Sequence, residues 1–311
     1  MLKKNLTKRR NQNTDALTDA CLACHDDLSM AKSIIYLGTD RIAICPTCNS
    51  WNYLPRPGLS GQVQIHNTPD YFEHEYFETR RRVSNHLQKR CKSVFKRLNP
   101  FISPAQLENV CVLDIGCDTG SFIRCAAEEF HIIPHGVDVS ERAIRVASNN
   151  GVYTYCGRLE DASTEMCNYS LITAIDVLEH VENPESLLTE IYKRLIPGGF
   201  VYIETPNPDS IIYLLGKAVS RLQLSIIKGP LHRLFPPQHL ICFSQDAIQN
   251  ISRKCGFKIM EYNTRSLSYQ DLSMTPVLAM SIVLCQIADI VTRKKILHWI
   301  ILERPKTISQ R

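Results

Sequence analysis

Short apolar runs and helical patterns alternate between residues 110 and 204. Continuous apolar runs of this kind are typical of parallel strands that are covered on both faces. We predict five such strands, at Val110–Ile115, Ile132–Val137, Val152–Cys156, Ser170–Ile175 and Phe200–Glu204. Two helices between them have clear ends: Ser140 can cap one that runs to Asn149, and Pro197-Gly198-Gly199 closes the one over Glu185–Leu195. The alternation predicts an α/β fold with an open, doubly wound and mostly parallel sheet.

Three other segments have a recognisable pattern. Trp51–Gln64 is rich in proline and glycine, which is typical of a linker. Apolar residues from Phe72 to Leu98 fall on one helical stripe, and basic residues fill the other faces. A solvated face explains such charges, and the alternative is that one of Arg80–Arg82 binds an anionic group. Thr205–Pro237 is apolar with a helical pattern, so we expect a lid over a substrate pocket or, alternatively, a packing helix.

Composition is that of an ordinary soluble globular protein. The chain has 311 residues, of which 44% are hydrophobic and 22% charged, with a net charge of +5 that does not indicate a nucleic-acid partner. No uninterrupted apolar run is long enough for a transmembrane segment. The apolar stretch Leu272–Ala288 is expected to be a core helix or the face of a homodimer, and the alternative is a helix on a membrane surface. Thirteen cysteines without a disulfide-framework spacing suggest the reducing cytoplasm.

These patterns divide the chain into four parts. We expect a basic, disordered tail over residues 1–20, a small module over 21–65 and a linker helix over 66–108. One large domain should fill 109–311, with the lid as an insertion at 205–237.

Two CxxC pairs mark the small module. Cys21-Leu-Ala-Cys24 and Cys45-Pro-Thr-Cys48 can supply four thiolates to one tetrahedral Zn²⁺ ion. The residues between them fit a short hairpin, with Ser33–Leu37 against Arg41–Ile44. Four protein ligands leave no open coordination position, so the metal would be structural, as in a zinc ribbon. Free thiols or a redox pair are the alternative interpretation.

The first predicted strand leads into a glycine loop and then a helix. Gly116 and Gly120 bound this loop, and glycine lets the backbone approach a ligand closely. Asp138 ends the second strand, where a carboxylate can accept hydrogen bonds from both hydroxyls of a ribose. Glu160 and Asp161 follow the third strand and are candidates for contact with an adenine. A dinucleotide site would need glycine at the sixth motif position, where this chain has Ser121.

Taken in order, these segments resemble the class I S-adenosylmethionine-dependent methyltransferases, and most closely the small-molecule branch with the ubiquinone-biosynthesis O-methyltransferases. The matching segments are Val112–Gly120, Gly136–Asp138, Gly157–Asp161, Asp176–Val181 and Ile196–Gly199. The resemblance implies a Rossmann-like sheet with an antiparallel last strand, closed by Gly256–Thr264 and Lys295–Glu303. A CxxC…CxxC extension is also similar to the N-terminal part of many bacterial methyltransferases.

The resemblance also implies roles for individual residues. The cofactor-binding residues would be Asp114, Gly116, Gly120, Asp138, Glu160, Asp161 and Asp176. His239 and His180 are the candidate general bases. In the ubiquinone-type relatives an acid and Glu-His cluster can hold a divalent metal, so Asp176, Glu179 and His180 form an alternative Mg²⁺ site. Asp118 stands where the family usually has glycine, and its charge would lie near the methionine part of the cofactor.

The expected activity is methyl transfer from S-adenosylmethionine to a small-molecule acceptor, at oxygen. Sugar, surface-polysaccharide, secondary-metabolite and quinone-type acceptors all fit the resemblance. One alternative is an RNA methyltransferase that uses the zinc module and the basic helix, although the segment after the fourth strand does not carry the Asn/Asp-Pro-Pro-aromatic pattern of base-amino methylases. The other is a methyltransferase-like binding module without activity.

Overall fold

The computed structural model describes residues 20–29, 31, 33–37, 40–56, 84–163, 166–222, 229, 231–232, 234–266 and 295–306. The expected basic tail, Arg80–Arg82 and the apolar stretch Leu272–Ala288 lie outside these residues. Within them, no helix combines the length and the apolarity that a membrane crossing requires.

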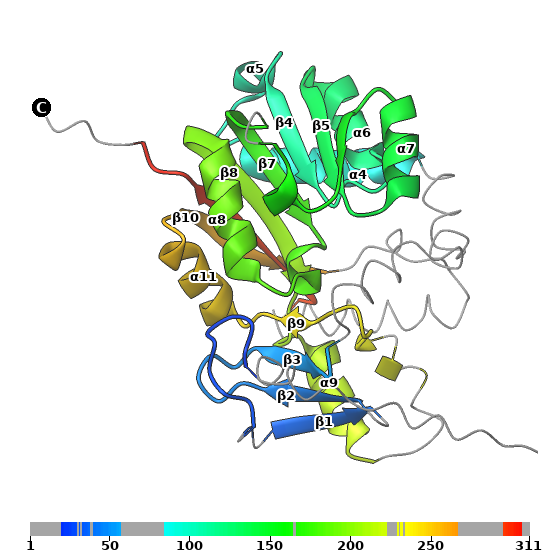
Figure 1. The fold of residues 1–311 in the computed structure, drawn as a ribbon, viewed down its shortest axis with the longest axis vertical. Helices are drawn as coiled ribbons and strands as arrows, with labels where there is room; N and C mark the ends of the chain where they lie inside the picture. The colour runs from blue at the N-terminus through cyan, green and yellow to red at the C-terminus, as the bar shows by residue number, and fades with distance from the viewer. Residues whose placement is uncertain are drawn as a thin grey trace, which may run out of the picture.

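Seven strands form the larger sheet, in the order β10-β11-β8-β7-β4-β5-β6 (Figure 1). The strands are β4 (Cys111–Ile115), β5 (Ile133–Asp138), β6 (Tyr153–Cys156), β7 (Tyr169–Ile175), β8 (Leu195–Pro206), β10 (Lys258–Arg265) and β11 (Leu297–Glu303). β11 is antiparallel to both of its neighbours, and the pairs from β8 to β6 are parallel. The five predicted strands, the closing hairpin and its antiparallel last strand are confirmed.

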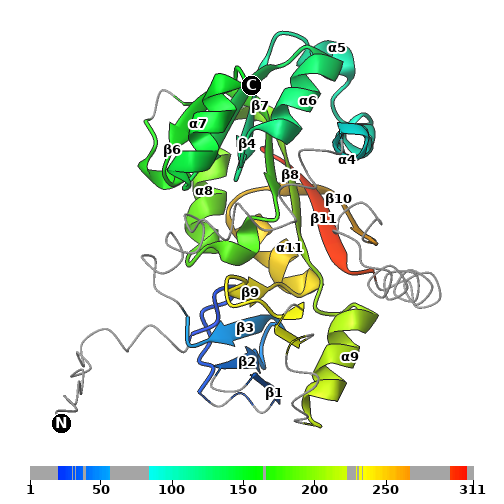
Figure 2. The same cartoon turned by 90° about the vertical axis from the view of Figure 1, so that its right-hand side faces the viewer.

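Helices cover both faces of this sheet (Figures 1 and 2). One face packs against α4 (Ser84–Leu98), α6 (Ser121–Phe130) and α7 (Glu141–Asn149), and the other against α8 (Pro184–Arg194) and α11 (Gln245–Lys254). Two neighbours in β4 show the alternation: Val112 packs with the α4 side and Leu113 with the α8 side. The short helix α5 (Pro104–Leu107) precedes β4. The continuous apolar runs of the central strands β4, β7 and β8 fit this arrangement, because both faces of these strands are covered.

The sequence predicted one end of α7 and one end of α8, and the structure can be compared with both. The Ser140 hydroxyl accepts a hydrogen bond from the Ala143 N–H at 3.3 Å, so the predicted cap of α7 is confirmed. The predicted end of α8, at Leu195, is right to within one residue, but the proline-glycine motif expected to close the helix lies elsewhere. α8 ends at Arg194 and β8 begins at the next residue, which places Pro197-Gly198-Gly199 inside the strand. Gly198 has a φ of +84° and donates its N–H to Arg304 O, so a bend in the strand replaces the expected loop.

A second, antiparallel sheet has the order β1-β2-β3-β9. Its strands are β1 (Ser33–Leu37), β2 (Asp40–Ile44), β3 (Trp51–Leu54) and β9 (Ile241–Cys242), so the predicted hairpin is confirmed. The linker prediction was wrong for Trp51–Leu54, which form β3. All four of its residues are buried, because Trp51 and Tyr53 pack with one apolar cluster and Leu54 with another.

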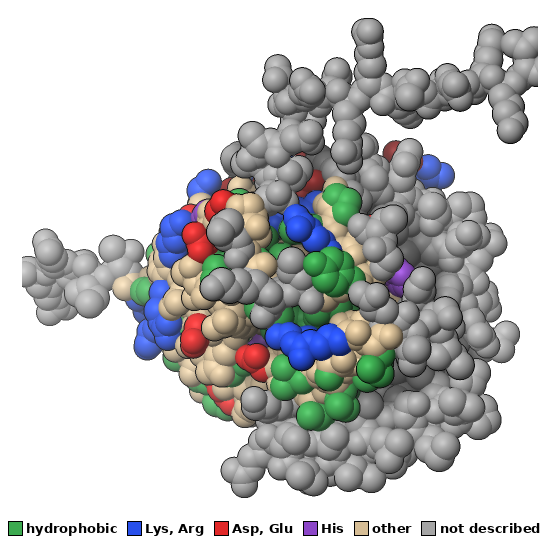
Figure 3. Space-filling model, turned by 90° about the horizontal axis from the view of Figure 1, so that it is seen from below, with side chains coloured by type: hydrophobic (Ala, Val, Ile, Leu, Met, Phe, Trp, Pro, Cys, Tyr) green, Lys and Arg blue, Asp and Glu red, His purple; other side chains and the backbone are tan. Residues whose placement is uncertain are grey.

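The helix α9 (Ile211–Ser220) lies in the predicted insertion. Its residue Tyr213 packs with Trp51 and Phe235 against the smaller sheet. On the same helix Leu215 is 55% exposed. Seen from below, hydrophobic and basic side chains lie side by side on this end of the molecule (Figure 3). α9 is therefore a packing helix on the smaller sheet, and its role as a lid stays a prediction.

Candidate functional site

The glycine loop turns sharply between β4 and α6. Gly116 has a φ of +68°, and a Cβ there would lie 2.5 Å from Val177 Cγ2. Gly120 is the N-cap of α6 with a φ of +73°, and its Cβ would lie 2.8 Å from Val152 Cγ2. Both positions combine a left-handed backbone with close packing, which explains why they are glycine. The loop brings the N-terminus of α6, with its unpaired N–H groups, to the edge of the sheet.

Asp118 and Asp138 hold this loop to the end of β5. The Asp118 N–H donates to one carboxylate oxygen of Asp138 at 3.0 Å, and the Ser140 N–H donates to the other at 2.8 Å. Asp118 has a φ of +49°. Glycine adopts this conformation easily and aspartate tolerates it, so a backbone requirement explains the glycine that the family usually has here. The Asp138 carboxylate lies where the sequence placed it, at the carboxyl end of the second parallel strand.

Asp114 lies beneath the loop, inside the sheet layer. Its side chain is buried and accepts a hydrogen bond from the Thr173 hydroxyl at 2.6 Å. Burial raises the pKa of Asp114 to about 7, and this hydrogen bond and the charge of Arg90 oppose the shift. The residue therefore supports the loop from inside, rather than from its exposed surface.

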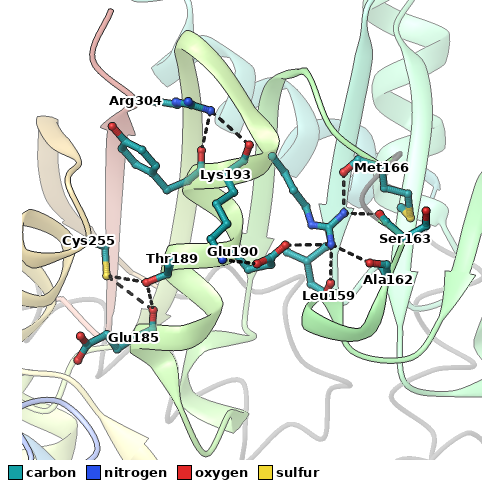
Figure 4. Close-up of polar contacts among 12 residues, drawn as sticks. Leu159, Ala162, Ser163, Met166, Glu185, Thr189, Glu190, Lys193, Cys255 and Arg304 are labelled. Carbon is teal, nitrogen blue, oxygen red and sulfur yellow. Dashed lines mark hydrogen bonds and ion pairs between the residues drawn. The ribbon is translucent and has the colours of Figure 1, made fainter. Parts of the chain in front are cut away.

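A loop after β6 carries the two acidic candidates for adenine contact. Glu160 pairs with Arg158 at 3.2 Å, and Asp161 belongs to the same short turn. The guanidinium of Arg194 on α8 holds this loop by four hydrogen bonds (Figure 4). The acceptors are the carbonyl oxygens of Leu159, Ala162, Ser163 and Met166, at 3.0, 3.0, 2.8 and 2.7 Å. The sequence analysis missed Arg194, because no motif marks a buried arginine near the end of a helix.

Charged groups gather at the carboxyl ends of β7 and β8. Arg90 on α4 donates to Asp176 at 2.9 Å and to Glu204 at 3.0 Å. Glu204 is buried and also bonds to Arg265 of β10. Burial alone would raise the pKa of Glu204, but the charges of Arg90 and Arg265 lower it below its usual value. Arg90 was also missed, since its position gives no sign that it faces inward from the basic helix.

The two candidate bases lie together beyond the end of β7. The rings of His180 and His239 are 4.8 Å apart and nearly perpendicular. His180 donates from Nδ1 to Gln238 O at 2.8 Å, while His239 Nδ1 is buried and has no hydrogen-bond partner among the described residues. Burial, together with His180, lowers the pKa of His239 well below its usual value. The imidazole of His239 is therefore neutral at pH 7 and able to accept a proton.

Glu179 completes this cluster. It accepts a hydrogen bond from the Thr205 hydroxyl at 2.9 Å, and burial with the nearby charge of Asp176 raises its pKa well above the usual range. Side-chain donor atoms of Glu179, His180 and His239 lie within 4.8 Å of one another. The Mg²⁺ trio expected from the sequence contained Asp176 instead, and the structure pairs that residue with Arg90. Neither the geometry nor the comparisons below support Mg²⁺ at the expected trio.

The four cysteines of the small module come together as predicted. Their sulfur atoms lie within 4.8 Å of one another, with Cys21 and Cys48 at 3.5 Å and Cys24 and Cys45 at 3.5 Å. A tetrahedral Zn²⁺ ion with Zn–S bonds of about 2.3 Å needs sulfur atoms about 3.8 Å apart. The donor set and its spacing therefore fit zinc.

Comparison with known proteins identifies the family. A methyltransferase domain model matches residues 83–262, which is more than half of the chain. The chain belongs to this methyltransferase family. It is an S-adenosylmethionine-dependent enzyme, in agreement with the order of motifs along the sheet.

Relatives and solved structures agree with this assignment. The methyltransferase is 25% identical to a ubiquinone biosynthesis O-methyltransferase of Leptothrix cholodnii, over 53% of this chain and 73% of the relative. It is 27% identical to the enzyme of the same name from Chromobacterium violaceum, over 56% of this chain and 79% of the relative. Its fold is similar to that of phosphoethanolamine N-methyltransferase 2 from Haemonchus contortus in complex with S-adenosylmethionine. That match has a TM-score of 0.56 and 16% identity, and covers 88% of this chain and 71% of the other.

Proposed function

We propose that this methyltransferase transfers a methyl group from S-adenosylmethionine to a hydroxyl group of a small molecule, and that a phenol of the catechol type is its acceptor. The observation that carries the proposal is the pair of half-buried histidines, 4.8 Å apart beside the carboxyl ends of β7 and β8, of which His239 has a lowered pKa. A phenol needs a base to become nucleophilic, and histidine suits that task. The names of the O-methyltransferase relatives support the acceptor class.

In the proposed cofactor site the adenosine lies across the ends of β4 and β5. The Asp138 carboxylate accepts hydrogen bonds from the ribose hydroxyls, and the turn with Glu160 and Asp161 lies beside the adenine. The loop from Gly116 to Gly120 faces the methionine part, with Asp176 at the same edge of the sheet. S-Adenosylmethionine supplies the activated methyl group, so the chain contributes mainly orientation and the removal of one proton.

The proposed reaction is an in-line displacement. The bond between the acceptor oxygen and the methyl carbon forms while the bond between sulfur and that carbon breaks, and the sulfur keeps the electron pair. The acceptor proton passes to His239, with His180 beside it.

The cofactor site can be tested by calorimetry with S-adenosylmethionine. Asp138→Ala removes the proposed ribose acceptor, so we expect binding at least 50-fold weaker. Glu141→Gln is the control, because Glu141 lies three residues further along but is 72% exposed and, within the described part of the chain, forms an ion pair with Arg145 on its own helix. Its affinity should stay within twofold of the parent. Unchanged binding by Asp138→Ala would show that the ribose lies elsewhere.

The acceptor class can be tested with 3,4-dihydroxybenzoate, scored by the release of S-adenosylhomocysteine. We expect turnover by the parent protein and a loss of at least 100-fold in kcat for His239→Ala, with S-adenosylmethionine affinity unchanged. An absence of turnover by the parent would reject the catechol class. Equal rates for parent and variant would reject His239 as the base.

We further propose that the four-cysteine cluster holds one structural Zn²⁺ ion. The four thiols leave no open position for a substrate, so the metal would stabilise the module without taking part in the reaction. Metal analysis should find one zinc per chain, lost in Cys45→Ser and kept in Cys156→Ser, whose cysteine is exposed and lies outside the cluster. Equal zinc contents in the two variants would contradict this assignment.

A further inference from the structure

The thiol cluster and the His239 segment lie on the two sides of strand β3. On one side β3 pairs with β2, which leads into the Cys45–Cys48 knuckle. On the other side it pairs with β9, where Trp51 lies opposite Cys242 and Asn52 opposite Ile241. β9 begins two residues after His239. A single buried strand therefore connects the metal-binding module to the proposed base.

Two buried polar side chains lie close to the thiols, one just before this strand at Ser50 and one within it at Asn52. Asn52 is fully buried, and its amide nitrogen donates to Cys21 Sγ at 3.5 Å, while its oxygen accepts from the Leu22 N–H at 3.1 Å. Ser50 is also fully buried, and its hydroxyl lies beside the Cys48 thiol. The Ser50 oxygen accepts the Ser244 N–H at 3.1 Å, so this hydroxyl joins the cluster directly to the segment after β9.

Leu240 is the point where the link reaches the candidate bases. Its carbonyl accepts a hydrogen bond from the Tyr53 N–H at 2.9 Å, and its own N–H donates to Glu179 O at 2.8 Å. The side chain of Leu240 is fully buried. The backbone next to His239 is thus held between β3 on one side and the Glu179–His180 turn on the other.

We propose that Ser50 and Asn52 are positioning residues, through which the four-cysteine cluster fixes the backbone around Leu240 and so the place of His239. The inference rests on the proposed function, because His239 as the base gives the link its catalytic meaning. Each side chain lies next to a thiol of the cluster. The Ser50 hydroxyl also accepts a hydrogen bond from the Ser244 N–H, and the backbone of Asn52 pairs with β9. Removal of either one should loosen the segment 236–244 without changing the edge of the sheet that holds the cofactor.

The variants Ser50→Ala and Asn52→Ala test this link. Ser29→Ala is the matched control, because that serine of the same module is exposed and, among the described residues, forms its hydrogen bonds with Asp27. Three measurements are made on the full chain: hydrogen exchange of peptides from 236–244, S-adenosylmethionine binding by calorimetry, and turnover of 3,4-dihydroxybenzoate. The exchange measurement needs no acceptor, so it decides the inference even if the acceptor class is wrong.

We expect Ser50→Ala and Asn52→Ala to exchange the amides of Leu240 to Ser244 at least tenfold faster than the parent. Peptides from β4 and β5 should exchange as before, with the number of cofactor sites and their affinity unchanged, and kcat should fall at least tenfold. Ser29→Ala should match the parent in all three measurements. Unchanged exchange over 236–244 in both variants would overturn the proposal. The proposal would also be overturned if kcat and the number of cofactor sites fell by the same factor, since that would indicate a smaller folded fraction of the protein.

Discussion

The clamp made by Arg194 gives a prediction that can be worked out from the structure. Its guanidinium is 3% exposed, donates to four backbone carbonyls of the loop after β6, and pairs with Glu190 at 3.0 Å. Arg194→Met keeps much of the side-chain volume, and the Leu159 and Ser163 carbonyls keep backbone donors, the N–H groups of Ala162 and Met166. Among the described residues, the Ala162 and Met166 carbonyls lose the donor that Arg194 supplies. Each buried acceptor that loses its partner costs about 1 kcal/mol or more. Two such carbonyls, together with the Glu190 carboxylate that loses this partner and is only 18% exposed, should lower the free energy of unfolding by about 3 kcal/mol.

The loss should be graded and should also reach the cofactor site. Arg194→Lys keeps the charge and three donors but not their planar arrangement, so we expect it to restore about half of the loss. Because the clamped loop carries Glu160 and Asp161, S-adenosylmethionine should bind about tenfold more weakly to Arg194→Met, or about 1.4 kcal/mol. Urea unfolding with zinc present measures the first quantity, and calorimetry the second.

The adjacent lysine is a close control. Lys193 is 65% exposed and pairs with the same Glu190, so Lys193→Met should change the stability by less than about 0.5 kcal/mol. A loss below about 1 kcal/mol in Arg194→Met would show that the Ala162 and Met166 carbonyls find other partners. A full loss of stability with unchanged cofactor affinity would show that the clamp holds the fold without holding the site.

Three further predictions concern the loop and the titrating groups. Gly116→Ala adds a Cβ at a positive φ and 2.5 Å from Val177, so urea unfolding should show a loss of about 3 kcal/mol in the free energy of unfolding. Gly151 also has a positive φ but has open space around it, so Gly151→Ala should lose only about 1 kcal/mol. Because burial raises the pKa of Asp114 to about 7, its contribution to stability falls as pH rises from about pH 4 to about pH 7, and Asp114→Asn should reduce that slope in unfolding measured across this range. Because burial lowers the pKa of His239, the acid limb of kcat/KM with 3,4-dihydroxybenzoate should lie below about pH 6.5, and a limb above about pH 7 would exclude His239 as the base.

The sequence predicted most of the larger sheet, because its central strands β4, β7 and β8 are buried on both faces and therefore form continuous apolar runs. The positions of Gly116 and Gly120 predicted the turn after β4, and the position of Asp138 predicted a carboxylate at the end of β5. The spacing of the two CxxC pairs was enough to predict that the four cysteines lie together, since two such pairs can bind one ion. The pairing of His180 with His239 was harder to foresee, because the two residues are brought together only by the packing of the insertion.

Other features depend on contacts that no local pattern reveals. Trp51–Leu54 lacks the polar alternation of a half-exposed strand, because one of its faces meets α9 and the other meets the thiol cluster. Its neighbouring prolines and glycines therefore suggested a linker. Arg90 and Arg194 look like surface charges on amphipathic helices. Only the folded chain shows that Arg90 turns inward to two carboxylates and Arg194 to the backbone carbonyls of the loop after β6.

The composite small sheet has a consequence for how such enzymes diverge. Three of its strands come from the beginning of the described chain, and the fourth, β9, comes from the middle of the catalytic half. In a hybrid that joins the first half of one enzyme to the second half of a distant relative, β3 would have to pair with β9 and pack against α9 of another sequence. Related enzymes that recombine should therefore inherit the first three strands of this sheet together with α9 and β9. An engineered graft of one of these segments should include the others.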